Sequence, residues 1–182
     1  MKTELKAKFL HHILDKKKEN EGFTLIELLV VIIIIGILSA IALPSFLNQA
    51  NKAKQSEAKT YIGSMNRAQQ AFYLEKNAFA GQADIGNLGL GIATQTTNYT
   101  YSIAGGGASS TLVTNQAATV VPLAPLKSYI GGVGVVTQTG TGEATTIATL
   151  CEADKAKVNS GADVTTISGL VTCPTNFSSL SK

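Results

Sequence analysis

The sequence predicts an α+β protein in which one long N-terminal helix packs against a C-terminal antiparallel sheet of about four strands. Three observations support this prediction: a continuous apolar run at residues 23–43, apolar side chains at helical spacing as far as residue 72, and short β-prone segments beyond residue 97, separated by glycine and polar turns. With 182 residues, the chain has room for one domain of ordinary size and a further element.

The apolar run predicts a helix that spans a membrane. At about 1.5 Å per residue, residues 23–43 form a helix of roughly 31 Å, which matches the hydrocarbon thickness of a bilayer. Its only polar side chains are Thr24, Glu27 and Ser39, and a soluble domain of this size rarely buries so continuous a run. Three lysines at residues 16–18 keep the N-terminal end in the cytoplasm, so residues after the span face outward.

Charge is concentrated near the N-terminus. Residues 1–22 contain six Lys and four acidic residues, and the other residues contain nine Lys and Arg against eight acidic residues. The net charge of +3 therefore leaves the rest of the protein nearly neutral, which argues against a general nucleic-acid-binding surface.

Two cleavage sites are compatible with this region. The stretch LSAIA, residues 38–42, has the small residues of an ordinary secretory cleavage site, and a cut there discards the apolar run. The other site lies between Gly22 and Phe23. A cut there removes only the basic leader, residues 1–22, and retains the apolar segment, residues 23–44.

The stretch GFTLIELLVVIIIIGILSAIALPSF resembles the processing site and first helical half of type IV pilins and their relatives. The Gly22–Phe23 junction and the positions of Glu27 and Pro44 match the family pattern, and the close resemblance covers about residues 15–77. It implies cleavage after Gly22 by a prepilin peptidase on the cytoplasmic side, followed by methylation of the new amino group of Phe23. The long leader is similar to that of some cyanobacterial pilins.

Glu27 is a carboxylate inside the apolar run, where a charge costs on the order of 2–3 kcal/mol or more unless it has a partner. The resemblance implies that cleavage supplies a partner, because the new amino group of Phe23 is cationic. Within one helix this amine can approach Glu27 from about a turn away, and in an assembly the amine of an incoming subunit can meet Glu27 of its neighbour. Such a pair depends strongly on distance and would set the axial stagger of the helices. The alternative is that the carboxylate extends to the lipid headgroups near the end of the span.

Helical periodicity continues beyond the span and predicts one helix from residue 23 to about residue 76, roughly 80 Å long. Pro44 lacks a backbone donor and is expected to kink or loosen this helix. The resemblance implies that the segment around Pro44 can extend inside a filament. The second half, residues 45–77, is predicted to be amphipathic. Its apolar stripe is expected to pack on the sheet and consists of Leu47, Ala58, Tyr61, Met65, Ala68 and Phe72.

Residues 78–182 are predicted to form a β head, with a connecting loop at residues 76–95. Tyr99, Tyr101 and Ile103 alternate with other residues, as expected for a half-buried strand. A glycine-rich hairpin turn is expected between the first two strands. The β-prone segments are 98–104, 110–121, 127–136, 145–153 and 164–172, and the turn is at 104–110.

The sequence offers few groups for catalysis. His11 and His12 lie in the leader and are lost on cleavage, so no catalytic residue, cofactor or metal ion is predicted for the processed chain. Cys151 and Cys173 have no histidine nearby and make a poor zinc site. If the head is exported, they are expected to form a disulfide that closes a loop of roughly two dozen residues. In the cytosol they would be free thiols.

Three further patterns have more ordinary explanations. Asp154 and Asp163 could bind calcium, but that cation needs six or more oxygen ligands, and solvated loop carboxylates are more common. The stretch GNLGLG, residues 86–91, neither follows a clear strand nor opens a helix, as a phosphate-binding loop does. Basic residues of the helix could form a groove for DNA or acidic neighbours in an assembly, although solvated helix charges are more common. They are Lys52, Lys54, Lys59, Arg67 and Lys76.

These observations favour a structural subunit of a type IV pilus and not an enzyme. The resemblance implies storage in the inner membrane with the head in the periplasm, then polymerisation with other pilin subunits into an extracellular fibre. It implies a prepilin peptidase and methyltransferase, an assembly platform and a separate ATPase as partners. The fibre would serve adhesion, twitching motility or DNA uptake, with surfaces or DNA as its partners.

Two other functions share some of these features. A pseudopilin of a type II secretion system has the same N-terminal region, although the cysteine loop and the size of the head favour a pilin. An enzyme or binding domain tethered by one span would need convergent polar groups, and the processed sequence offers no obvious set of them.

Overall fold

The computed structural model of the protein describes most of the chain after the leader. The described residues are Lys8, His11, 23–91, 93–140, 142–169 and 171–180. Gly22, His12 and most of the predicted leader lie outside them. The chain divides into two compact units, residues 1–47 and 48–182.

The long helix α2 spans Leu25–Lys76, 52 residues, which confirms the predicted helix. Its residues up to Leu47 belong to the first unit and the others to the second. Glu27 in the first turn and Lys76 in the last turn have the charges that a helix dipole favours at those ends. The helix passes through Pro44 without a break.

Within the second unit, α2 packs on the sheet through a face that only partly matches the predicted stripe. The buried residues of the helix are Ala58, Ile62, Met65, Asn66 and Gln69. Tyr61, Ala68 and Phe72 are only half-buried beside that core. The assignment of Leu47 to the stripe is wrong, because Leu47 precedes the covered part of the helix and is exposed. The buried face includes two polar residues, since Asn66 and Gln69 donate hydrogen bonds to backbone carbonyls at 2.8 and 2.9 Å.

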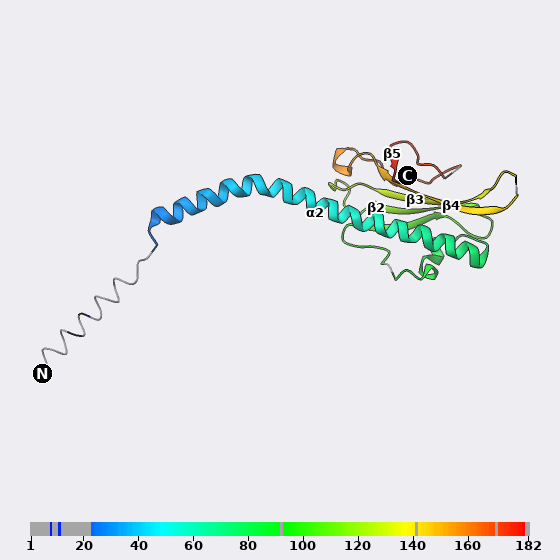
Figure 1. Ribbon diagram of the computed structural model, residues 1–182, viewed down its shortest axis with the longest axis horizontal. Coiled ribbons are helices and arrows are strands. Elements are labelled where there is room, and N and C mark those ends of the chain that lie inside the picture. Colours follow the sequence, from blue (N-terminus) through cyan, green and yellow to red (C-terminus); the bar gives the residue numbers. More distant parts are fainter. Residues whose placement is uncertain are drawn as a thin grey trace. The chain divides into compact units, whose positions relative to one another are not determined.

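Among the described residues, five antiparallel strands form a sheet in which each strand pairs with the next (Figure 1). The strands are β1 (Tyr99–Gly105), β2 (Leu112–Thr119), β3 (Tyr129–Thr137), β4 (Ala144–Ala153) and β5 (Phe177–Ser179). Two short 3-10 helices, η1 (Gln82–Leu88) and η2 (Lys157–Asn159), lie before β1 and after β4.

Four of the five predicted β-prone segments correspond to β1 to β4, which confirms the antiparallel sheet and the turn at residues 104–110. The fifth, residues 164–172, is wrong as a strand. Gly169 and Val171 there have positive φ angles of 67° and 57°, which interrupt an extended conformation. The sheet ends instead with β5, a three-residue strand at the edge.

The sheet is covered on both faces. On one face, Tyr99, Tyr101 and Val133 join the buried residues of α2 in the main hydrophobic core. On the other face, the segment after η2 places Ile167 against Ile130, in a second cluster that also contains Cys151. The strand β3 can be covered on both faces because three of its nine residues are glycines.

Candidate functional site

The start of α2 is closed by reciprocal hydrogen bonds between Thr24 and Glu27. The backbone N–H and the hydroxyl of Thr24 both donate to Oε2 of Glu27, each at 2.8 Å. The backbone N–H of Glu27 donates to Oγ1 of Thr24 at 3.2 Å. This arrangement is a capping box, and it fixes the Glu27 carboxylate at the first turn. The role of Thr24 was not predicted, although the T-x-x-E spacing signals such a cap.

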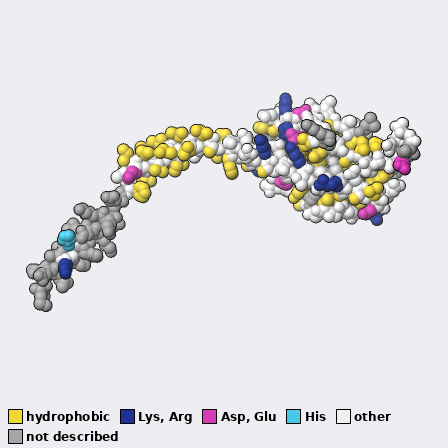
Figure 2. All heavy atoms as spheres, in the orientation of Figure 1, with side chains coloured by type: hydrophobic (Ala, Val, Ile, Leu, Met, Phe, Trp, Pro, Cys, Tyr) yellow, Lys and Arg dark blue, Asp and Glu magenta, His cyan; other side chains and the backbone are white. Residues whose placement is uncertain are grey.

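The apolar half of α2 is exposed on every side. Its Leu, Ile and Val side chains between residues 25 and 43 are 46 to 82% exposed, and Figure 2 shows mostly apolar side chains along it. The most apolar stretch of 18 residues has a mean hydropathy of 3.0, and none of its residues is buried. The helix α2 is therefore long and apolar enough to cross a membrane. A helix that is apolar all round needs to be covered by lipid or by other helices.

Pro44 lies at the end of this apolar half. Because proline has no N–H, the carbonyl of Ala40 lacks its helical donor. This turn therefore lacks one helical hydrogen bond, and the kink and the role of Pro44 in assembly stay predictions.

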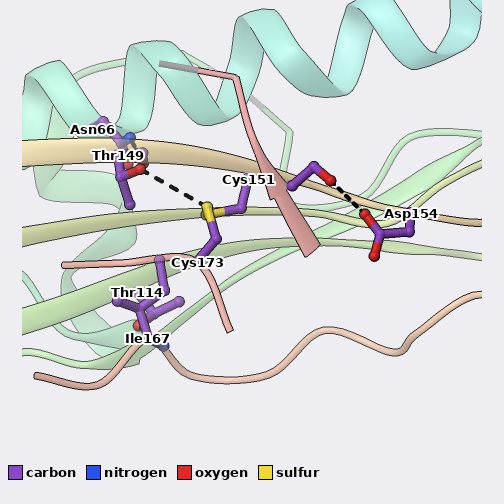
Figure 3. The surroundings of a disulfide bond; sticks show 8 residues. Asn66, Thr114, Thr149, Cys151, Asp154, Ile167 and Cys173 are labelled. Atoms are coloured by element: carbon purple, nitrogen blue, oxygen red, sulfur yellow. Dashed lines mark hydrogen bonds between the residues drawn. A yellow bond between two sulfur atoms is a disulfide. The ribbon is translucent and has the colours of Figure 1, made fainter. Parts of the chain in front are cut away.

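Cys151 in β4 and Cys173 in the segment before β5 form a disulfide, which confirms the predicted pair (Figure 3). Their Cα atoms are 5.7 Å apart, and their sequence separation is 22. Nearby, the backbone N–H of Ile167 donates to Oγ1 of Thr114 in β2 at 3.0 Å. The disulfide and this bond hold the C-terminal segment on the sheet face opposite α2.

Glu152 of β4 links the sheet to α2. Its carboxylate lies 2.7 Å from Nζ of Lys59 and 2.7 Å from Nζ of Lys127, and the hydroxyl of Tyr129 donates to it at 3.0 Å. Burial raises the pKa of Glu152, but hydrogen bonds from Lys127 and Lys59 outweigh it, so the pKa is lowered from its usual value. Glu152 is thus ionised at neutral pH. Lys59 belongs to this ion pair and is not simply a solvated helix charge.

The other sequence candidates take part in local structure. Asp154 accepts a hydrogen bond from the hydroxyl of Ser178 at 2.5 Å, and Asp163 pairs with Lys157. The part of the chain that the structure describes contains no group of three or more His, Cys, Asp or Glu placed to hold a metal ion. Residues 86–91 include the end of η1, where Leu88 is buried in the core.

Two family models match the chain. The model of the type IV pilin-like G and H proteins matches residues 55–174, which are 120 of the 182 residues. The chain belongs to this type IV pilin-like family. The model of the prokaryotic N-terminal methylation motif matches residues 17–43 of the pilin-like chain, a range that contains the predicted cut and the apolar run.

This pilin-like chain is similar to several curated proteins. It is 49% identical over 65 residues to the type IV major pilin protein PilA of Myxococcus xanthus, covering 36% of this chain and 30% of that protein. It is 34% identical over 94 residues to the type IV wide pilus major component of Thermus thermophilus, covering 51% of this chain and 70% of that protein. It is also 34% identical over 64 residues to the type II secretion system core protein G of Aeromonas hydrophila, covering 35% of this chain and 45% of that protein.

The matched segments span less than half the length of the Myxococcus and Aeromonas proteins. No solved structure matches the chain. The named relatives are pilus components and a secretion-system core protein, which agrees with the expectation that this chain is not an enzyme. The exposed apolar helix and the pilin relatives fit a protein that is anchored in a membrane and later forms part of a pilus fibre.

Proposed function

We propose that this pilin-like chain is a structural subunit of a type IV pilus and polymerises through the apolar half of α2. The observation that carries the proposal is a helix exposed on every side, with the capped carboxylate of Glu27 at its start. Lipid can cover such a helix first and the same helices of other subunits later, since both surroundings are similarly apolar. Membership of the pilin-like family supports this function.

Before assembly, the subunit spans the inner membrane once, with its N-terminus in the cytoplasm and its head in the periplasm. A prepilin peptidase cuts between Gly22 and Phe23, and the new amine of Phe23 is methylated. An assembly platform and a separate ATPase then move the subunit into the extracellular fibre, which serves adhesion, twitching motility or DNA uptake. The methylation motif at residues 17–43 supports this order of events.

Glu27 determines how neighbouring helices line up. Its carboxylate pairs with the cationic amine of Phe23 on the adjacent subunit. In surroundings of low dielectric, a shift of a few ångströms weakens this pair steeply, whereas apolar contacts depend little on register. The cap does not compete with the pair, because both hydrogen bonds from Thr24 end on Oε2 and leave Oε1 available as an acceptor.

Two substitutions separate the charge of Glu27 from its role in the cap. Glu27→Gln removes the charge but retains an oxygen that can accept the hydrogen bonds of Thr24. Thr24→Ala removes the side chain of the cap, at a cost of about 1 kcal/mol, but retains the carboxylate. We expect Glu27→Gln, like Glu27→Ala, to be processed normally and to form few or no fibres. We expect Thr24→Ala to form fibres.

Electron microscopy of sheared surface fibres, with a blot for the processed subunit, measures both outcomes. Abundant fibres from Glu27→Gln would refute the ion pair. Loss of fibres in Thr24→Ala alone would show that the cap, and not the charge, is what assembly requires.

A pseudopilin of a type II secretion system is the second candidate, and the similarity to core protein G supports it. Mass spectrometry of sheared surface fibres from wild-type cells decides between the two functions. This chain as the main fibre component supports the pilin. Its absence from fibres, together with a secretion defect on deletion, supports the pseudopilin.

A further inference from the structure

A polar groove of about 770 Å³ opens in the second unit, beside the first residues of α2 that belong to it. Asn48, Lys52 and Lys59 of α2 line one part, and Lys127 and Glu152 line another. Figure 2 shows Lys and Arg side chains gathered at the end of the second unit where α2 enters it. The volume is that of a small-ligand site.

The groove carries a net positive charge. Three lysines line it, Lys52, Lys59 and Lys127, with one carboxylate, that of Glu152. The carboxylate oxygens of Glu152 lie 2.7 Å from Nζ of Lys59 and of Lys127. Because an ammonium group has three N–H donors, both lysines retain donors for another acceptor. Within the described ranges, Lys52 is exposed and forms no ion pair. Such a cluster favours a compact anion such as a phosphate.

The loop that supplies Pro125 and Lys127 to the groove wall also has exposed apolar side chains. Val121 and Leu123, between β2 and β3, are 57 and 71% exposed, and Val158 in the groove wall is 51% exposed. The loop is held in place, since the backbone N–H of Val158 donates to the carbonyl of Ala124 at 3.0 Å. Exposed apolar side chains beside lysines match a membrane surface, where phosphates lie next to acyl chains.

The chain itself keeps the groove close to the end of the apolar segment. Asn48, in the groove wall, follows Pro44 by four residues. Four residues reach at most about 14 Å even when fully extended. The headgroup layer itself extends several ångströms beyond the hydrocarbon. The Asn48 end of the groove is therefore within reach of the headgroup layer when the apolar segment is in a bilayer.

We propose that, before assembly, this groove binds the phosphate of an anionic phospholipid in the outer leaflet, while Val121 and Leu123 rest in the interfacial layer. Lys52, Lys59 and Lys127 supply the donors, and Glu152 positions two of them. The proposal rests on the proposed function, because it needs the subunit to be stored in the membrane. A second copy of the chain is the competing occupant.

A single tryptophan reports the position of the loop, because the chain has no Trp of its own. The full chain with Leu123→Trp is reconstituted in vesicles of phosphatidylcholine, with or without phosphatidylglycerol, that contain a headgroup-nitroxide lipid. We expect stronger quenching of the emission with the anionic lipid. Adding Lys52→Glu should lower the ratio of bound to free heads by about fivefold or more. Lys54→Glu is the matched control, because it changes the charge equally but lies outside the groove wall, and it should have little effect.

Several outcomes would overturn the proposal. Equal quenching with and without phosphatidylglycerol would refute binding of the anionic lipid. Equal losses of quenching in Lys52→Glu and Lys54→Glu would also refute the groove, because they indicate a general attraction between the lysines and the membrane. Quenching that depends on the protein-to-lipid ratio and not on lipid charge would assign the groove to a second copy. Ile37→Trp, quenched by lipids brominated in mid chain, reports insertion separately. If the Trp at residue 37 is not quenched, the apolar segment does not insert and the proposed function fails too. If it is quenched but the loop shows no lipid dependence, only the lipid-binding role of the groove is refuted.

Discussion

Gly131 determines how closely α2 approaches the sheet. A Cβ at this position in β3 would lie 2.3 Å from Oδ1 of Asn66 and 2.5 Å from Cγ2 of Ile62. Asn66 cannot move without loss, because its Nδ2 donates to the carbonyl of Thr149 at 2.8 Å and its Oδ1 accepts from Asn115 at 2.9 Å. A side chain at residue 131 would therefore disturb both the apolar contact and the buried hydrogen bonds.

We expect Gly131→Ala to destabilise the head by about 1–3 kcal/mol, the usual cost of overpacking a core. Gly63→Ala is the control, because nothing lies within 4 Å of a Cβ built there, in the middle of α2. It should stabilise the protein by about 0.5–1 kcal/mol, since alanine favours a helix more than glycine does. Urea unfolding of the full chain in detergent measures both values. A Gly131→Ala variant as stable as the wild type would show that α2 can shift freely on the sheet.

The C-terminal segment is held on the sheet by its disulfide, by a hydrogen bond from Ile167 and by apolar packing. Replacing both Cys151 and Cys173 by Ser opens a loop with a sequence separation of 22. The expected loss is about 3 kcal/mol in the chain-entropy model. The loss should be local, because α2 packs on the opposite sheet face. Hydrogen exchange should show lost protection at the backbone N–H of Ile167 and retained protection in α2 near Ile62. Unchanged protection at Ile167 would mean that packing alone holds the segment.

Elements with a clear periodic pattern were predicted, and those without one were not. The alternation of Tyr99, Tyr101 and Ile103 predicted strand β1, and all three side chains are buried. The edge strand β5 has only three residues, too few for a pattern, and its place follows from pairing with β4. The segment at 164–172 has β-branched residues because one side packs on the sheet. Its backbone at Val171 is left-handed, and no propensity indicates that.

The helix face was predicted incompletely for a related reason. An apolar stripe could not include Asn66 and Gln69, because their burial depends on backbone partners from other elements. Gln69 donates to and accepts from the backbone of Ala80, each at 2.9 Å, and Asn66 donates to the carbonyl of Thr149. The burial of these two polar side chains therefore depends on tertiary hydrogen bonds, which the sequence does not reveal.

For the molecule as a whole, the candidate site could be predicted because it depends on local sequence. The apolar run, Glu27 and the basic leader are contiguous, so their chemistry does not require a fold. The groove around Glu152 could not be predicted in this way. It brings together α2, the loop before β3 and the end of β4, and Lys59 and Lys127 are distant from Glu152 in the sequence.

In the proposed function, leader cleavage connects the membrane-stored form with the assembled form, and this step is testable at Gly22. The nitrogen of Phe23 in the uncut chain is an uncharged amide that cannot form an ion pair with Glu27, so under this proposal uncut helices lack the pair that sets their register. We expect Gly22→Leu to block cleavage, to leave full-length precursor in the membrane fraction, and to abolish fibres. Gly36→Leu makes the same change inside the apolar run, where nothing lies within 4 Å of an added Cβ, and should be cut normally.

A blot with an antibody against the leader distinguishes precursor from product, and carbonate extraction shows that both remain in the membrane. Uncut subunits found in sheared fibres would show that the Phe23 amine is not needed for assembly. In that case the carboxylate at the start of α2 would need another partner, because a charge left alone among apolar helices is unfavourable.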